Sequence, residues 1–188
     1  VAAAIVPGSE VLVRDVGVNP TRAGILNVLE SMGAKVHLEE YRMAGGEPVA
    51  DILVKHSELK PVEIGGSIIP SLIDEIPVLA VAMAMAHGTS TVRDAVELRA
   101  KESDRIAMIV STLKQMGVEA HEIADGFVIH GRGKIPGNCR LSAGGDHRIA
   151  MASAVAGLTA EMPVVVEDFN CVDISYPAFL QDLQGLTR

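Results

Sequence analysis

Residues 144–158 read GGDHRIAMASAVAGL and place three polar side chains directly before a run of small apolar residues. The stretch from Ile149 to Leu158 is apolar on nearly every side, which is typical of a helix buried in a protein interior. Asp146 can cap this helix, and the two glycines before it allow a sharp turn. His147 and Arg148 add positive charge to the end that the helix dipole already makes positive. A bound anion would remove this repulsion, whereas a capped helix with solvated His and Arg side chains is the simpler alternative.

The plan of this stretch occurs in three parts of the chain, residues 2–36, 82–120 and 152–186. Each part has an alanine-rich helix end, a turn, a strand and then an amphipathic helix. The three strands end in the dipeptides Arg14-Asp15, Arg93-Asp94 and Glu167-Asp168. Self-similarity at this spacing predicts a β/α supersecondary unit repeated three times.

Two kinds of helix are expected from the pattern of apolar residues. Val78–Ala86, like Ile149–Leu158, is apolar all round and belongs in the interior, whereas Ala23–Met32 and Ile106–Met116 have one polar face and cover a surface. Residues 118–123 and 126–131 each have the pattern of a strand and are separated only by Ala124 and Asp125, which predicts a hairpin. Residues 50–57 predict another strand. The sequence therefore predicts one α/β (α+β) domain of three similar units around buried inner helices, without an internal domain boundary.

Composition limits the classes of partner. The chain has 188 residues, 48% of them hydrophobic, and a formal net charge of −8, so we expect binding neither to nucleic acid nor to a membrane surface. Aromatic residues make up only 3% of the chain, which argues against base stacking. Cys139 and Cys171 lie far apart without metal-ligand spacing, so we expect reduced thiols, no metal and a cytoplasmic location. The chain lacks an initiator Met and begins like a helix end entering a strand, so we expect a fragment.

Three further helix entrances carry charged residues. The stretch LRAKESDRIAM, residues 98–108, has Ser103 or Asp104 as the candidate cap, with Arg99, Lys101, Glu102 and Arg105 around it. Residues 70–80 place Asp74 and Glu75 before a buried helix, and residues 19–26 offer an Asn19 cap, Pro20 and Arg22. Carboxylates among fixed cations favour acid–base chemistry on an anionic substrate. For Asp74, a role as a helix cap alone is the competing interpretation.

Four stretches of the sequence resemble the C-terminal half of the 5-enolpyruvylshikimate-3-phosphate (EPSP) synthase family. They read LRAKESDRIAM, GGDHRIAMASAVAGL, IPSLIDEIPVLAVAMAMAHG and CVDISYPAF. The resemblance covers essentially the whole chain and implies that residues 1–188 form one domain of the two-domain enolpyruvyl transferase fold. Such a domain contains three βαβαββ units, and its inner helices point their N-termini at the cleft between the two domains.

The resemblance also implies an activity. The family transfers the enolpyruvyl group of phosphoenolpyruvate to the 5-hydroxyl of shikimate 3-phosphate and releases phosphate, without a metal or an organic cofactor. This reaction lies on the route to chorismate and the aromatic amino acids. By resemblance, Asp74 contacts the shikimate hydroxyls and acts as a base, and Glu102 lies near the methylene carbon that gains and loses a proton. Lys101 bridges toward the reacting hydroxyl and phosphoenolpyruvate.

The remaining residues implied by the resemblance bind substrate. Arg105 and Arg148 match arginines that hold the carboxylate of phosphoenolpyruvate, and His147 and Asp146 complete the same wall. Planar guanidinium groups suit bidentate contacts to carboxylate or phosphate. The N-terminal half of the enzyme supplies most contacts to shikimate 3-phosphate in the family, so we expect the isolated chain to be inactive without that half.

Two positions depart from the family pattern. Many members carry a lysine where this chain has Ile174, and an asparagine where it has Glu97. Two alternatives remain beside the EPSP synthase interpretation. One is a domain related to the UDP-N-acetylglucosamine enolpyruvyl transferase, against which the KESDR and DHR motifs argue. The other is a noncatalytic β/α repeat module that binds a protein partner.

Overall fold

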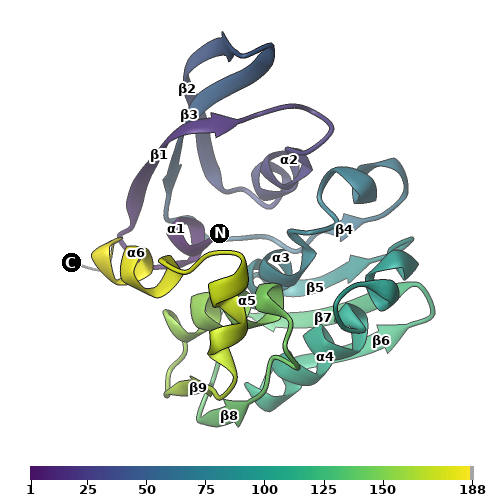
Figure 1. The fold of residues 1–188 in the computed structure, drawn as a ribbon. Coiled ribbons are helices and arrows are strands. Elements are labelled where there is room, and N and C mark those ends of the chain that lie inside the picture. The colour runs from purple at the N-terminus through teal and green to yellow at the C-terminus, as the bar shows by residue number, and fades with distance from the viewer. Residues whose placement is uncertain (187–188) are drawn as a thin grey trace.

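The structure is a computed structural model that describes residues 1–186, and it divides into three related units (Figure 1). The first unit contains α1 (Ala2–Ile5), β1 (Glu10–Gly17), α2 (Gly24–Ser31), β2 (Lys35–Ala44) and β3 (Glu47–Lys55). Its strands form an antiparallel sheet in the order β1-β3-β2, which leaves β1 at an edge. The β1–β3 register runs from Glu10 opposite Lys55 to Gly17 opposite Val49, with a bulge between Val13 and Val16.

The second unit has the complete β-α-β-α-β-β order. It contains β4 (Glu63–Ile64), the 3₁₀ helix η1 (Gly66–Ser71), α3 (Ile76–Met85), β5 (His87–Val92), the 3₁₀ helix η2 (Val96–Ala100), α4 (Arg105–Gln115), β6 (Glu119–Ile123) and β7 (Gly126–Arg132). Its sheet has the order β4-β5-β7-β6, in which β4 and β5 are parallel and the other pairs antiparallel. Ala124 and Asp125 turn the predicted hairpin between β6 and β7.

The third unit contains β8 (Cys139–Leu141), α5 (His147–Gly157), β9 (Val164–Val166), the 3₁₀ helix η3 (Phe169–Ile174) and α6 (Phe179–Leu186). β8 and β9 pair in parallel, as β4 and β5 do. The predicted α/β class is confirmed. Among the described residues, however, only the second unit contains the full set of elements.

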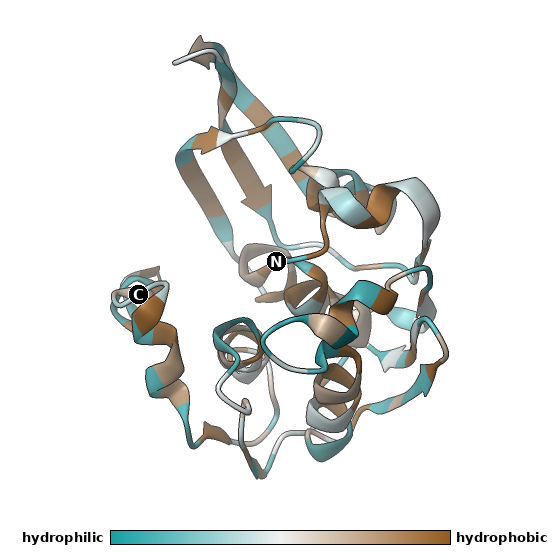
Figure 2. Ribbon diagram, turned by 45° about the vertical axis from the view of Figure 1, so that its right-hand side comes forward, coloured by the Kyte–Doolittle hydropathy of each residue, from teal (hydrophilic) through white to brown (hydrophobic). Residues whose placement is uncertain are grey.

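The inner helices form the centre of the core. Eight of the ten residues of α3 are buried, and α3 packs against α5 and β7. Ile106, Ile109 and Leu113 turn the apolar face of α4 toward this core, while Lys114 stays exposed. Figure 2 shows the result: hydrophobic colour follows the inner helices and long stretches of the upper strands, and hydrophilic colour is frequent in the connecting loops. The predicted division into buried and surface-covering helices is therefore confirmed.

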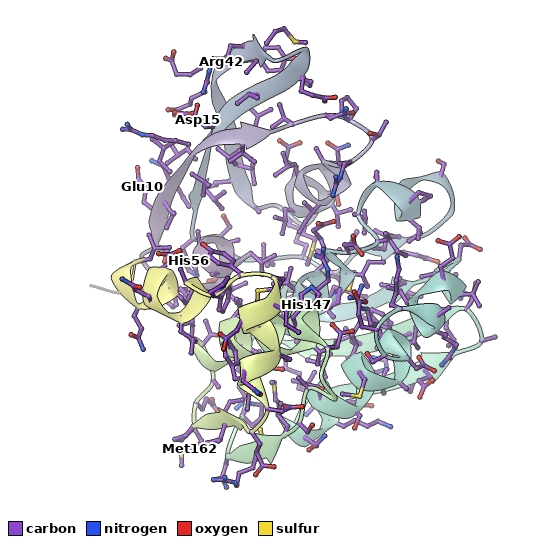
Figure 3. All side chains as sticks on the ribbon, viewed as in Figure 1. Glu10, Asp15, Arg42, His56, His147 and Met162 are labelled. Carbon is purple, nitrogen blue, oxygen red and sulfur yellow. The ribbon has the colours of Figure 1, made fainter. Side chains whose placement is uncertain are left out.

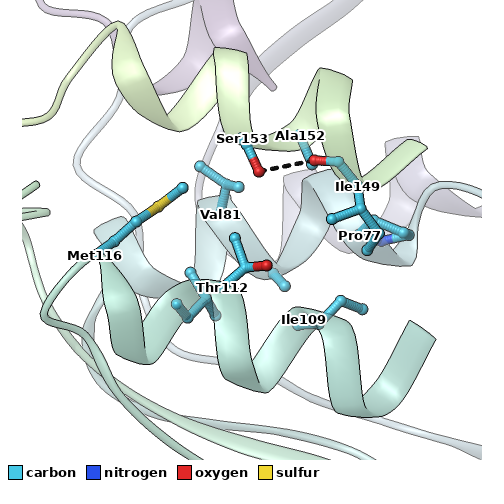
Figure 4. Close-up of a pocket in the computed structure, with 10 residues that line it drawn as sticks. Pro77, Val81, Ile109, Thr112, Met116, Ile149, Ala152 and Ser153 are labelled. Atoms are coloured by element: carbon cyan, nitrogen blue, oxygen red, sulfur yellow. Dashed lines mark hydrogen bonds between the residues drawn. The ribbon is translucent and has the colours of Figure 1, made fainter. Parts of the chain in front are cut away.

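A small cavity of about 20 Å³ lies between α3, α4 and α5 (Figure 4). Its lining is almost entirely apolar and includes Pro77, Val81 and Ile149. The Ser153 hydroxyl, which also faces this space, donates a hydrogen bond to the Ile149 carbonyl over 2.8 Å. The Thr112 hydroxyl is buried and has no hydrogen-bond partner among the described residues. The cavity lies between the three helices, and its lining contains no charged side chain.

One local prediction is wrong. The helix expected to start at Asn19 starts at Gly24 instead, because the Asn19 Oδ1 accepts hydrogen bonds from the backbone N–H and the hydroxyl of Thr21 and forms a turn.

Candidate active site

The N-termini of α3, α4 and α5 meet at one place and bring their charged residues together. Arg105 at the start of α4 contacts Asp74, which precedes α3, and Asp146, which precedes α5. Figure 3 labels His147, at the start of α5, close to the centre of the molecule. Residues separated by more than 70 positions in sequence thus share one site.

Arg105 is the centre of this cluster. Its side chain is completely buried and is surrounded by three carboxylates. Its Nε donates to the Asp146 Oδ2 over 2.8 Å, one Nη donates to the Glu102 Oε2 over 2.5 Å, and the other lies 3.3 Å from the Asp74 Oδ1. A buried guanidinium is stabilised only when its donors are satisfied in this way. In this arrangement Arg105 therefore organises the carboxylates.

Asp146 is buried together with Arg105 and remains ionised. Burial by itself would raise the pKa of Asp146, but the hydrogen bond and charge of Arg105 outweigh burial and hold this pKa below its ordinary value. Ser103 donates to the Asp146 Oδ2 over 2.9 Å, and the Arg148 backbone N–H donates to the Asp146 Oδ1 over 2.9 Å. Asp146 thus caps α5, as predicted, and also anchors Arg105 and Ser103.

Asp74 has a different role from the cap considered for it. The N-cap residue of α3 is Glu75, and no side chain caps this helix end. The Asp74 carboxylate instead lies 3.8 Å from Lys101 Nζ and 3.4 Å from an Arg148 Nη. Arg148 also donates to the Asp74 backbone carbonyl over 3.0 Å. Asp74 therefore links all three cations of the site.

The cluster is exposed to solvent on one side. The side chains of Lys101, Asp74 and Arg148 are 30%, 33% and 31% exposed, and Glu102 is 50% exposed. These groups form a rim of mixed charge above the buried Arg105–Asp146 pair. The rim offers two cations to an anionic ligand and two carboxylates for proton transfer.

Two residues of this region stood outside the predicted set. Glu75 is half-buried at the entrance of α3; desolvation raises its pKa above the ordinary value, and the charge of Arg148 partly opposes the rise. Ser103 was considered only as a helix cap, yet it bonds to Asp146, while Asp104 caps α4 by accepting from the Ala107 N–H over 3.1 Å. No sequence signal separates these two adjacent polar residues, because either could cap the helix.

Three other residues singled out in the sequence lie apart from the cluster. Arg99 bonds to Asp104 over 2.8 Å and to Glu122 over 2.9 Å, so it braces the α4 entrance from outside. Glu97 is exposed on η2, and Ile174 is 90% exposed on η3. In residues 1–186, no group of three or more His, Cys, Asp and Glu side chains is arranged to hold a metal ion.

A sequence profile of the family described as EPSP synthase (3-phosphoshikimate 1-carboxyvinyltransferase) matches residues 1–183. The chain belongs to the EPSP synthase family. Among curated relatives, the 3-phosphoshikimate 1-carboxyvinyltransferase of Syntrophomonas wolfei is 55% identical over 187 residues, which are 100% of this chain and 44% of the relative. That of Geobacter sulfurreducens is 52% identical over 179 residues, covering 95% of this chain and 42% of the relative. The chain thus spans less than half the length of these EPSP synthase family members.

Solved structures agree with this assignment to the EPSP synthase family. EPSP synthase from Acinetobacter baumannii superposes with a TM-score of 0.95 and 39% identity, over 98% of this chain and 43% of that structure. The enolpyruvyl transferase NikO from Streptomyces tendae superposes with a TM-score of 0.75 at 20% identity, which shows a shared fold. A family-level assignment to EPSP synthase argues against the UDP-N-acetylglucosamine alternative.

Proposed function

We propose that this chain is the C-terminal half of a 3-phosphoshikimate 1-carboxyvinyltransferase and acts together with the N-terminal half. The reaction joins the 5-hydroxyl oxygen of shikimate 3-phosphate to C2 of phosphoenolpyruvate and releases phosphate. The observation that carries this proposal is the meeting of three helix entrances at Arg105, with Lys101, Arg148, Asp74 and Glu102 on an open rim. Membership of the EPSP synthase family supports the same reaction.

Each residue of the rim has a role in this proposal. Lys101 and Arg148 bind the negative charges of phosphoenolpyruvate, helped by the N-terminus of α5 and by His147. Asp74 takes the proton of the 5-hydroxyl as its oxygen attacks C2. Glu102 gives a proton to the methylene carbon C3 during addition and takes one back when phosphate leaves. All proton transfers in this scheme use side chains of the protein.

Arg105 reaches a ligand in this scheme only by exchanging partners. Each of its three side-chain nitrogens contacts a carboxylate, so a bound anion competes with Glu102 or Asp74 for these donors. Glu102 is the partner that can leave, because it is half-exposed whereas Asp146 is fully buried. Its release from Arg105 would free Glu102 for proton transfer as phosphoenolpyruvate arrives. Asp146 then acts as a positioning residue that keeps Arg105 in place.

The proposal includes a cytoplasmic location for the protein. Among the described residues, no helix is long and apolar enough to cross a membrane. Cys139 and Cys171 are both free and partly buried. Free thiols are typical of a reducing compartment, which supports a cytoplasmic location.

The decisive experiment mixes this chain with the separately produced remainder of the Syntrophomonas wolfei relative. Phosphate release from phosphoenolpyruvate and shikimate 3-phosphate is measured for each part alone and for the mixture. We expect turnover only in the mixture, and a loss of about 10²-fold to 10⁴-fold for Glu102→Gln, because general acid–base catalysis contributes on that order.

Glu119→Gln is the matched control. Glu119 is also exposed and paired with an arginine, Arg132 at 3.0 Å, but it lies on β6 away from the site. Full activity of this control beside an inactive Glu102→Gln variant supports the assigned role. Two folded parts that associate without turnover, and without saturable binding of phosphoenolpyruvate, would instead support the noncatalytic binding module.

A further inference from the structure

Two buried hydroxyl groups lie deeper in the core than the charged pair of α4 and α5. Arg105 and Asp146 bond to each other at the entrances of these two helices. Thr112 follows Arg105 by seven residues on α4, and Ser153 follows Asp146 by seven residues on α5. Because seven residues make about two helical turns, each hydroxyl lies on the same helix face as the charged residue above it. Both residues are buried.

The two hydroxyls differ in their hydrogen bonds. Ser153 donates to the Ile149 carbonyl, four residues earlier in α5, over 2.8 Å, as serine and threonine in helices commonly do. The Thr112 hydroxyl has no hydrogen-bond partner within residues 1–186. An unpaired buried hydroxyl costs its full desolvation, so native proteins pair such groups with protein atoms or with ordered water. Thr112 therefore requires a partner.

The cavity between α3, α4 and α5 is lined by both residues (Figure 4). Its volume of about 20 Å³ holds one water molecule, which needs about 10–15 Å³. Pockets that bind organic ligands are far larger, about 300–1,000 Å³. The lining is apolar except for the hydroxyls of Thr112 and Ser153 and the thioether sulfur of Met116. The size of the cavity thus limits its occupant to a molecule such as water.

The polar groups of the lining are complementary to a water molecule. The hydrogen of the Thr112 hydroxyl is unpaired, so this group is available as a donor. The hydrogen of the Ser153 hydroxyl is used on the Ile149 carbonyl, which leaves the Ser153 oxygen as an acceptor. The Met116 sulfur is a second, weak acceptor. One donor and two acceptors match the three hydrogen bonds that a buried water typically makes.

We propose that the cavity between α3, α4 and α5 is a binding site for one ordered water molecule that bridges Thr112 to Ser153. The water accepts a hydrogen bond from the Thr112 hydroxyl and donates to the Ser153 oxygen and the Met116 sulfur. It satisfies the buried Thr112 hydroxyl and joins α4 to α5 about two turns from the Arg105–Asp146 pair. The bridge involves no substrate group and is independent of the proposed function.

The test combines crystallography with urea unfolding of the native chain, Thr112→Val, Ser153→Ala and the double variant. Valine has nearly the shape of threonine without the hydroxyl, so Thr112→Val removes the bridge and keeps the packing. We expect electron density for one water in the native cavity and none in Thr112→Val. The folding equilibrium constant of Thr112→Val should fall about fivefold, the usual effect of one lost hydrogen bond. The loss in the double variant should be smaller than the product of the two single losses, because both substitutions remove the same water.

Ser111→Ala and Thr112→Ser are the controls. Ser111 is the neighbour of Thr112 on the exposed side of α4, and its hydroxyl lies 3.3 Å from Gln115 Nε2. Loss of this solvated hydroxyl should leave the folding equilibrium constant nearly unchanged. Thr112→Ser keeps the hydroxyl and should keep the water. It also preserves the crystallographic test if Thr112→Val does not fold, because absence of the water from both the native and the Thr112→Ser cavities would reject the site.

Three results would overturn the water bridge. The first is a native cavity without water density. The second is a Thr112→Val variant more stable than the native chain, because removal of a dry, unpaired hydroxyl relieves its desolvation. The third is a double variant whose losses multiply, which would show that Thr112 bonds within its own helix, to the Met108 carbonyl. None of these measurements depends on phosphate release, so failure of the proposed function would leave the water site unaffected.

Discussion

Arg105 carries a permanent positive charge in a side chain that has no exposed surface. Removing such a charge from water is unfavourable unless ionised partners and hydrogen bonds replace the solvent. Asp146 provides that compensation from an equally buried position, while Glu102 and Asp74 contribute from the open rim. The roles of the three carboxylates follow from their exposure. The buried Asp146 carboxylate fixes the position of Arg105, and the exposed carboxylates of Glu102 and Asp74 are accessible to a ligand.

We predict that Asp146→Asn lowers the free energy of unfolding by about 3–5 kcal/mol, because it leaves the Arg105 charge buried without its principal counter-ion. Urea unfolding followed by circular dichroism measures this change. Ser103→Ala removes only the hydroxyl that bonds to Asp146 and should cost about 1 kcal/mol. A loss for Asp146→Asn no greater than that of Ser103→Ala would contradict the role given to the buried pair.

The same pair sets a dependence on pH. The pKa of Asp146 is lower in the folded protein than in the unfolded chain. Its contribution to stability is therefore complete above the unfolded pKa of about 4 and is lost as the pH falls through the folded value. The Asp146→Asn variant should lose less stability than the native chain on acidification below about pH 4. Equal losses would show that other carboxylates dominate acid unfolding.

At the scale of secondary-structure elements, β7 packs so closely against the end of α3 that position 131 requires glycine. A Cβ atom added to Gly131 would lie 2.3 Å from the Ala86 carbonyl oxygen and 2.4 Å from that of Met83. Both obstacles are backbone atoms at the C-terminal end of the inner helix, so no side-chain rotation can relieve them. Glycine at this position lets the sheet and the inner helix approach each other.

We therefore predict that Gly131→Ala destabilises the chain by about 3 kcal/mol or more, because the helix end or the strand must move. Gly17→Ala in β1 is the matched control, since a Cβ there meets nothing within 4 Å. It should change stability by less than about 0.5 kcal/mol. Thermal unfolding of both variants measures the difference, and similar melting temperatures would show that the approach of β7 to α3 is looser than described.

At the scale of the whole molecule, a net charge of −8 surrounds a site that we propose for anions. The overall field repels such ligands, so binding depends on the local cations and helix N-termini. An anion would therefore be bound by specific groups of the site and not by the net charge of the chain.

We predict that the chain by itself binds phosphoenolpyruvate weakly and that Arg148→Ala weakens this binding about tenfold or more, because charge-assisted hydrogen bonds are lost. Arg140→Ala is the control for charge alone. Arg140 lies on β8, its side chain is 71% exposed, and it pairs with Glu167, the residue directly after β9. Isothermal titration calorimetry measures both affinities. An equal effect of the two substitutions would mean that the anion is held by general charge and not by Arg148.

The sequence alone determined the repeat, the two kinds of helix, the β6–β7 hairpin and the charged entrances, because each depends on local periodicity or on residues adjacent in the chain. It also placed Asp146 correctly as the cap of α5. Only the tertiary structure decided how these parts are used. It showed that Asp74 pairs with cations and leaves the α3 entrance uncapped, and that Arg105 is buried among three carboxylates. Those properties depend on burial and on contacts between distant segments, which a local pattern of residue types does not encode.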